Sequence, residues 1–125
     1  MNEERRIIIA ADSKIHIRSL NDISDALGIC IGAGGLVLTE NDLSPEFFDL
    51  RSGLAGELFQ KFINYNVRVA IVLLDTDAYG ERFSELACEH RTHSMIRFVS
   101  SADEAKAWLD REIEVETERQ RTEGH

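Results

Sequence analysis

Residues 68–74 constrain the fold more than any other stretch, because Arg68 is followed by six aliphatic residues without interruption. A strand with one face in water alternates apolar and polar side chains, whereas a strand covered on both faces is apolar throughout. We therefore expect residues 68–74 to form a strand that is covered on both faces, as the strands of parallel sheets are.

Other apolar runs predict four further strands, at residues 6–11, 14–19, 35–39 and 95–99. In the second of these runs Ile15 and Ile17 alternate with polar residues, which is the pattern of a half-buried strand. Only Asp12 and Ser13 separate this run from the first, so we expect the two runs to pair as a β-hairpin.

Amphipathic stretches between the strands predict helices at roughly residues 22–30, 45–63, 79–91 and 101–109. The second helix opens with Ser44 and Pro45, a capping hydroxyl followed by a proline that suits the first turn. Gly53 and Gly56 are poor helix formers inside this stretch. Either the core helix starts near Ser52, or the glycines permit the close approach of another segment.

The predicted element order is β-β-α-β-α-β-α-β-α, which indicates the α/β fold class with a single domain over residues 1–109. Right-handed crossovers unite such strands in a mixed, mostly parallel five-stranded sheet with helices packed against it, and the hairpin supplies the antiparallel member. Residues 110–125 hold six acidic residues and only two apolar ones. We expect them to form a charged C-terminal helix extension or tail.

The charge balance excludes several classes of partner. Acidic residues outnumber basic ones by 23 to 14, and nucleic acids and anionic membranes attract basic surfaces. No apolar run approaches the ~18 residues of a membrane helix, and the five apolar residues at 7–11 are too few for a signal peptide, so we expect a cytoplasmic location. Cys30 and Cys88 lack metal-binding spacing, so we expect buried thiols, no metal site and no cofactor.

The most informative segment, residues 47–57, joins a predicted strand to the core helix. Within it Asp49, Arg51, Ser52 and Gly53 are the candidate regulatory and partner-binding residues. A phosphate on Ser52 at a helix N-terminus would be stabilised by free backbone N–H groups, with the Arg51 guanidinium beside it. The alternative is that Ser52 is merely a cap or a small residue within the helix.

Carboxylates follow the predicted strands at the edge where parallel sheets bind ligands. Asp75 and Asp77 come after the buried strand and form a candidate ligand edge, and Asp42 and Asp49 follow the preceding strand. Such a group can bind Mg²⁺ or raise the pKa values of its members for acid–base work. Asp is equally suited to ordinary turns and caps, and no catalytic residue is assigned.

Residues 47–65 read Phe-Phe-Asp-Leu-Arg-Ser-Gly-Leu-Ala-Gly-Glu-Leu-Phe-Gln-Lys-Phe-Ile-Asn-Tyr. This stretch, with its continuation to residue 72 and the residues between Phe98 and Leu109, closely resembles a bacterial family known only as a domain of unknown function. The resemblance implies no activity. The chain departs from the family's pattern around residues 74–76 and 89–91.

More distantly, Phe48 and Asp49 followed by Ser52, Gly53 and Leu54 resemble the STAS domain of anti-sigma factor antagonists. That family has Asp-Ser-Ser-Gly-Leu at the same strand-to-helix junction, and phosphorylation of a Ser there breaks partner binding. The resemblance implies a STAS-like fold and makes Ser52 the corresponding Ser. One residue is inserted between Asp49 and the Ser-Gly step.

These features predict a non-enzymatic regulatory or protein-interaction module of STAS-like type, switched at residues 49–53. Two alternatives stay open: a small-molecule-binding protein or minor enzyme that uses the strand-end carboxylates, and a homo-oligomeric structural module. The expected partner is a protein, and a homodimer is one form that such an interaction would take.

Overall fold

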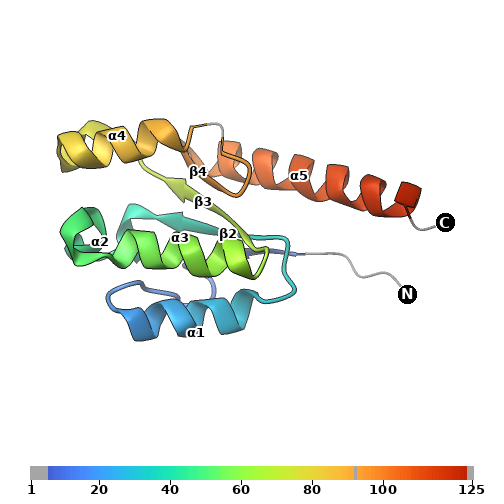
Figure 1. The fold of residues 1–125 in the computed structure, drawn as a ribbon, viewed down its shortest axis with the longest axis horizontal. Helices are drawn as coiled ribbons and strands as arrows, with labels where there is room; N and C mark the ends of the chain where they lie inside the picture. The colour runs from blue at the N-terminus through green and yellow to red at the C-terminus, as the bar shows by residue number, and fades with distance from the viewer. Residues whose placement is uncertain (1–5, 92, 124–125) are drawn as a thin grey trace.

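The fold is a parallel β-sheet with helices on both faces (Figure 1). The computed structural model describes residues 6–91 and 93–123. Its strands and α-helices follow in the order β1 (Ile7–Ile9), α1 (Leu20–Cys30), β2 (Gly35–Thr39), α2 (Pro45–Phe48), α3 (Leu54–Asn64), β3 (Arg68–Val72), α4 (Glu81–Glu89), β4 (Ile96–Val99) and α5 (Ala102–Glu123). Short 3₁₀ turns, η1 (Glu40–Asp42), η2 (Leu50–Ser52) and η3 (Thr76–Tyr79), follow β2, α2 and β3.

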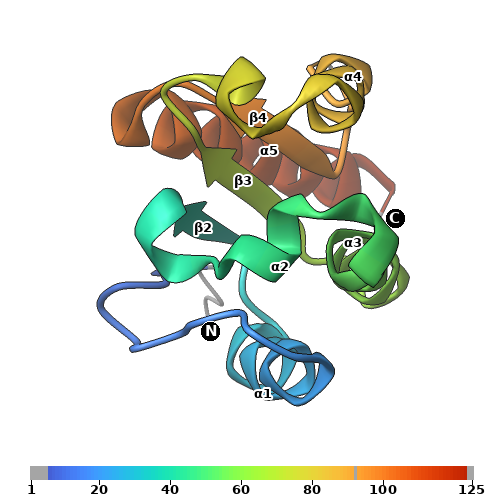
Figure 2. The ribbon, with the colours of Figure 1, turned by 90° about the vertical axis from the view of Figure 1, so that its left-hand side faces the viewer.

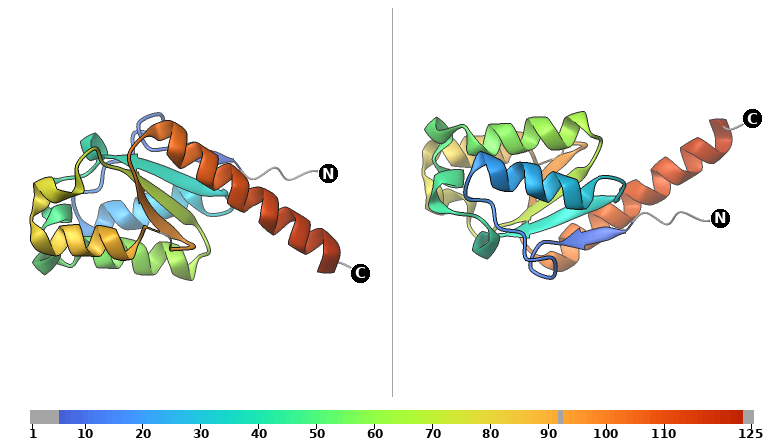
Figure 3. Two further views of the ribbon diagram at one scale, coloured as in Figure 1. Left: turned by 90° about the horizontal axis from the view of Figure 1, so that it is seen from above. Right: turned by 90° about the horizontal axis from the view of Figure 1, so that it is seen from below.

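The strands lie in the order β1-β2-β3-β4, and each pairs in parallel with its neighbour. Because right-handed crossovers between strands in this sequential order all return over one face, α1, α3 and α4 lie on the same side of the sheet. Helix α5 follows the last strand and covers the opposite face (Figure 3). The predicted α/β class and the parallel strand pairing are therefore confirmed.

The predicted hairpin is wrong, and within the described residues the sheet has four parallel strands rather than five mixed ones. After β1 the chain turns back, with the Ile15 N–H donating to the Ala10 carbonyl at 2.9 Å. It then runs beside the loop that follows β2, where Ile17 forms an isolated parallel bridge to Leu43. Ile15 and Ile17 are buried as predicted, but the Ile17 backbone pairs with this loop and not with β1. The alternation of apolar and polar residues therefore predicted burial correctly and strand pairing wrongly.

Two apolar clusters hold the layers together, one on each face of the sheet. The larger lies under α1, α3 and α4 and includes five phenylalanines, Phe47, Phe59, Phe62, Phe83 and Phe98. The smaller joins Val37, Ala70 and Val99 of the strands to Ala105, Trp108 and Leu109 of α5. Since Val69 and Ile71 face the first cluster and Ala70 the second, β3 is covered on both faces, as its sequence predicts.

Close packing brings α5 against β2. A Cβ atom at Gly35 would lie 2.6 Å from Cδ2 of Leu109 and 3.2 Å from the carbonyl oxygen of Arg68, so any larger residue would force Leu109 to move. Helix α5 then continues through the predicted tail as far as Glu123. No helix in the described part of the chain combines the length and apolar character needed to cross a membrane.

The two cysteines differ in their surroundings. Cys30 is buried in the larger cluster, and burial raises the pKa of its thiol to about 11. Cys88 is exposed on α4, so the expectation of two buried thiols is wrong for this residue.

Candidate functional site

The predicted junction lies at the carboxyl edge of the sheet, which Figure 2 views from the front. Asp49 caps the turn η2, and its Oδ1 accepts hydrogen bonds from the backbone N–H of Arg51 at 3.1 Å and from Arg51 Nε at 3.2 Å. The side-chain bond from Arg51, followed by the backbone bond, lowers the pKa of the Asp49 carboxyl. Asp49 is therefore a carboxylate at neutral pH and orients the Arg51 guanidinium.

Ser52 and Gly53 mark the start of the core helix. The Ser52 hydroxyl donates to the carbonyl of Glu46 at 2.7 Å and accepts from the N–H of Leu54 at 3.2 Å, while the residue as a whole is exposed. Gly53 adopts a left-handed φ of 77° as the N-cap of α3, a conformation that favours glycine. Of the two sequence alternatives, the one in which the core helix starts near Ser52 is correct.

Asp75 and Asp77 both accept local hydrogen bonds. Asp75 Oδ1 accepts from the N–H of Asp77 at 3.0 Å, and Asp77 Oδ1 accepts from the hydroxyl of Ser84 at 2.6 Å. These bonds are the turn and cap contacts that Asp commonly makes. Within the described residues no group of three His, Cys, Asp or Glu side chains is placed to hold a metal ion. Ligand binding by Asp75 and Asp77 stays a prediction.

A groove of about 760 Å³ joins the junction to the connection between β3 and α4. Its lining comprises Pro45, Phe48, Asp49, Leu50, Arg51, Tyr79, Gly80, Glu81, Arg82 and Phe83. The structure thus brings Asp49 and Arg51 into one groove, with Ser52 and Gly53 at the adjacent start of α3. Asp77 lines a different cleft, between α4 and α5.

Two aromatic side chains that the sequence did not single out contribute to the groove. The rings of Phe48 and Tyr79 stack with centroids 3.8 Å apart and planes 9° apart, and Phe83 meets Phe48 edge-on. The Tyr79 hydroxyl also bonds the carboxylate of Glu40. This bond, then burial and the charges of Glu40 and Asp75, raise the pKa of Tyr79 to about 12, so its proton stays in place to link the ends of β2 and β3.

Comparison with known proteins assigns a family to this chain. Residues 2–109 match the family model DUF4180, described as a domain of unknown function. The chain belongs to the DUF4180 family. No similar protein was found among curated proteins, and no similar fold among solved structures.

The DUF4180 match confirms membership of a family of unknown function, as the resemblance of residues 47–72 predicts, and gives no link to STAS domains. The matched range contains the whole groove and every candidate residue of the sequence. It ends inside α5, so the last helical turns of the described chain lie beyond the DUF4180 range.

Proposed function

We propose that this DUF4180 chain is a non-enzymatic protein-interaction module whose partner binds the groove between α2 and the start of α4. The observation that carries the proposal is the composition of that groove: the stacked rings of Phe48 and Tyr79 line it together with Arg51 and Arg82. Aromatic and Arg side chains are enriched in protein interfaces and dominate their binding energy.

The aromatic side chains of the groove are held in place before any partner arrives. Phe48 stacks on Tyr79, and the hydroxyl of Tyr79 bonds Glu40. Binding costs free energy when side chains must be immobilised at the interface. A groove whose aromatic rings are already ordered loses less on binding.

We further propose that phosphorylation of Ser52 regulates this interaction, as the STAS resemblance suggests. Ser52 is exposed, its hydroxyl donates to the carbonyl of Glu46, and Arg51 precedes it in the chain. A phosphate adds roughly −1.5 to −2 charge and has no proton to donate to a carbonyl at neutral pH. It would compete with Asp49 for the Arg51 guanidinium and so change both the shape and the charge of the groove.

A second candidate function is self-association, which exposed apolar side chains favour. Ile29 and Ile31 lie at the end of α1, and Tyr65 follows α3, the helix packed beside it. These three side chains are 49%, 57% and 59% exposed. Exposed apolar side chains mark a protein contact surface where they form one contiguous patch. Sedimentation velocity of the wild type and an Ile31→Ser variant tests this function: a wild-type dimer that the variant loses supports it, and a wild-type monomer refutes it.

The groove is tested with the full-length protein as bait. Partners are captured from a lysate and purified, and their affinity is measured for wild type, an Arg51→Ala/Arg82→Ala variant and Lys106→Ala. Lys106 is an exposed cation on α5, on the opposite face of the sheet, so it is the matched control. We expect at least tenfold weaker binding for the groove variant, about 1.4 kcal/mol, and no more than a twofold change for the control. Equal affinity of all three proteins would refute the proposed surface.

The switch has its own pair of variants. Ser52→Ala and Ser52→Glu both remove the hydroxyl that bonds Glu46 and Leu54, and only the second adds negative charge. A switch predicts that Ser52→Glu binds the partner much more weakly than Ser52→Ala. If the two bind equally, Ser52 is a structural residue and the groove proposal stands without a switch.

A further inference from the structure

A second cleft, of about 690 Å³, lies between α4 and α5 and reaches the ends of β3 and β4. It is separate from the groove described above and contains Asp77 but none of residues 49–53. Strand β4 forms part of its lining through Arg97, Phe98 and Val99. Because β4 is the last strand in the sheet order, it has a strand neighbour on one side only within the described chain.

The backbone of β4 offers hydrogen-bonding groups on its open side. In the β3–β4 ladder the N–H of Val69 donates to Met95 and the N–H of Leu73 donates to Val99. Backbone groups alternate sides along a strand, so the intervening residues Ile96 and Phe98 direct theirs away from β3. The Ile96 N–H donates a hydrogen bond to Nδ1 of His93 at 3.1 Å. Phe98 is therefore the residue of β4 whose backbone groups remain on the open edge.

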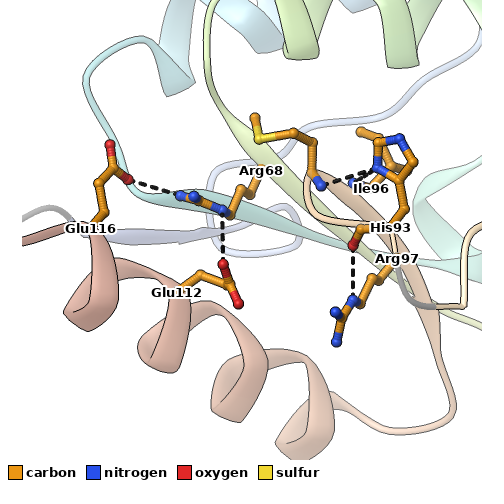
Figure 4. Close-up of polar contacts among 7 residues, drawn as sticks. Arg68, His93, Ile96, Arg97, Glu112 and Glu116 are labelled. Atoms are coloured by element: carbon orange, nitrogen blue, oxygen red, sulfur yellow. Dashed lines mark hydrogen bonds and ion pairs between the residues drawn. The ribbon is translucent and has the colours of Figure 1, made fainter. Parts of the chain in front are cut away.

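Three arginines line this cleft in a chain whose net charge is −9. Arg97 lies on β4, where its guanidinium packs over the Trp108 ring at 4.9 Å. Its Nε donates to the carbonyl of His93 (Figure 4). Arg91 follows α4, and Arg111 lies one turn beyond Trp108 on α5. Arg91 and Arg111 have no ion pair in the part of the chain that the structure describes.

The acidic side chains of the cleft are already hydrogen-bonded. Asp77 accepts from Ser84, and Glu104 accepts from the N–H and the hydroxyl of Ser100 at 3.2 and 3.0 Å. Helices α4 and α5 both run against the direction of β4 (Figure 1). Asp77 precedes α4 and Glu104 lies in the first turn of α5, so both acids lie toward the end of β4, whereas Arg91 follows α4 and Arg111 lies further along α5, toward the start of β4. At the end of the cleft opposite these acids, Arg91 and Arg111 are therefore available to bind carboxylates.

We propose that this cleft binds an extended acidic peptide of a partner protein, which pairs with β4 as an added strand. The peptide backbone would bond Phe98, and its carboxylates would bind Arg91 and Arg111, beside the Arg97 guanidinium that packs on Trp108. Strand addition supplies main-chain hydrogen bonds, and alternate side chains provide specificity. Arg97 and Arg111 lie on the α5 side, whereas Ala87 and Cys88 line the α4 side. The preferred peptide thus has acidic residues at alternate positions, separated by small or apolar ones.

Charge favours an acidic peptide over a second copy of this chain as the occupant. Two β4 edges paired antiparallel about a two-fold axis would bring the arginines of one cleft to the end of the other, where Asp77 and Glu104 are already hydrogen-bonded. The carboxylates of an acidic peptide are not committed in this way and can form bidentate contacts with guanidinium groups.

The probe is a capped peptide, Glu-Thr-Glu-Val-Glu-Thr-Glu, compared with a version in which Gln replaces every Glu. Trp108 is the chain's single Trp and lines the cleft, so its fluorescence reports binding to the full-length protein. Amide exchange of Phe98 reports strand addition. We expect saturable binding of the Glu peptide, slower exchange at Phe98, and at least tenfold weaker binding of the Gln peptide.

Matched variants separate the cleft from general charge attraction. Arg91→Gln/Arg111→Gln should weaken Glu-peptide binding at least tenfold, whereas Lys106→Gln, an exposed cation on α5 outside the cleft lining, should change it less than twofold. The proposal is overturned if the Glu peptide does not bind at millimolar concentration, or if both variants respond alike. It is also overturned if the Phe98 amide exchange is unchanged by bound peptide, or is already slowed by dimerisation of the free protein.

Discussion

Replacing Arg68 by Met tests what holds the second half of α5 against the sheet. Arg68 opens β3, and its side chain is only 12% exposed. Its Nη1 donates to Glu116 at 2.9 Å, and its Nε lies 3.8 Å from Glu112, too far for a hydrogen bond (Figure 4). Met keeps most of the apolar stem and removes the charge, so the variant isolates the polar contacts.

The expected loss follows from these contacts. A hydrogen bond to a charged group contributes about 1.5–3 kcal/mol, and the longer contact to Glu112 adds little. Breaking a fully buried ion pair costs roughly 3–5 kcal/mol, but Glu112 and Glu116 are 28% and 17% exposed and can turn partly toward water. We therefore expect Arg68→Met to lower the free energy of unfolding by about 2 kcal/mol, or roughly 6–10 °C in Tm.

Urea denaturation at pH 7 measures this free energy, and amide exchange locates the effect. Exchange should accelerate at residues 112–119 of α5 and much less at residues 105–109, which Trp108 and Leu109 hold in the core. Arg111→Met is the control, because Arg111 is an exposed cation on the same helix. A free energy of unfolding within about 0.5 kcal/mol of wild type, the range of ordinary surface substitutions, would refute the reasoning, as would uniform acceleration along α5.

Two further predictions concern the packing of α5 and the start of β4. Gly35→Ala should cost about 1–3 kcal/mol by overpacking Leu109, and Leu109→Ala should cost less in that background than in wild type; strict additivity in urea denaturation would contradict this. Burial, then the charges of His90 and Arg97, lower the pKa of His93 below its usual 6.5, and its Nδ1 accepts two backbone N–H groups. The unfolded chain therefore binds more protons just below pH 6.5, and stability falls as pH drops from 6.5 to the lowered pKa. His93→Gln should remove this part of the slope, and an unchanged slope would contradict the assignment.

The sequence by itself determined the layered character of the fold. The unbroken aliphatic run after Arg68 predicted a strand covered on both faces, and Val69, Ala70 and Ile71 are buried in the two clusters. Such patterns can be read locally, because the burial or exposure of each face of a strand or helix sets how apolar and polar side chains alternate along consecutive residues. Gly53 is a poor helix former, and the sequence left two alternatives open there; the structure selects the one in which the core helix starts after it.

The pairing of segments was decided by the tertiary structure. Ile15 and Ile17 were correctly predicted to be buried, yet their run lies beside the loop after β2 and not against β1. Burial of a side chain does not specify which backbone its neighbours will bond. The choice of backbone partner depends on the packing of distant segments, and a local alternation of apolar and polar residues carries no information about that packing.

The candidate site divides in the same way. Asp49 and Arg51 could be found from residue type and position after a predicted strand. The stack of Phe48 on Tyr79 could not, because these residues meet only when β2 and β3 become neighbours and their loops leave the same edge. The open edge of β4 likewise follows from strand order alone. The chemistry of a single residue can be predicted from the sequence. A surface formed by two loops, or by the last strand of a sheet, cannot, because it depends on which elements become neighbours through long-range pairing.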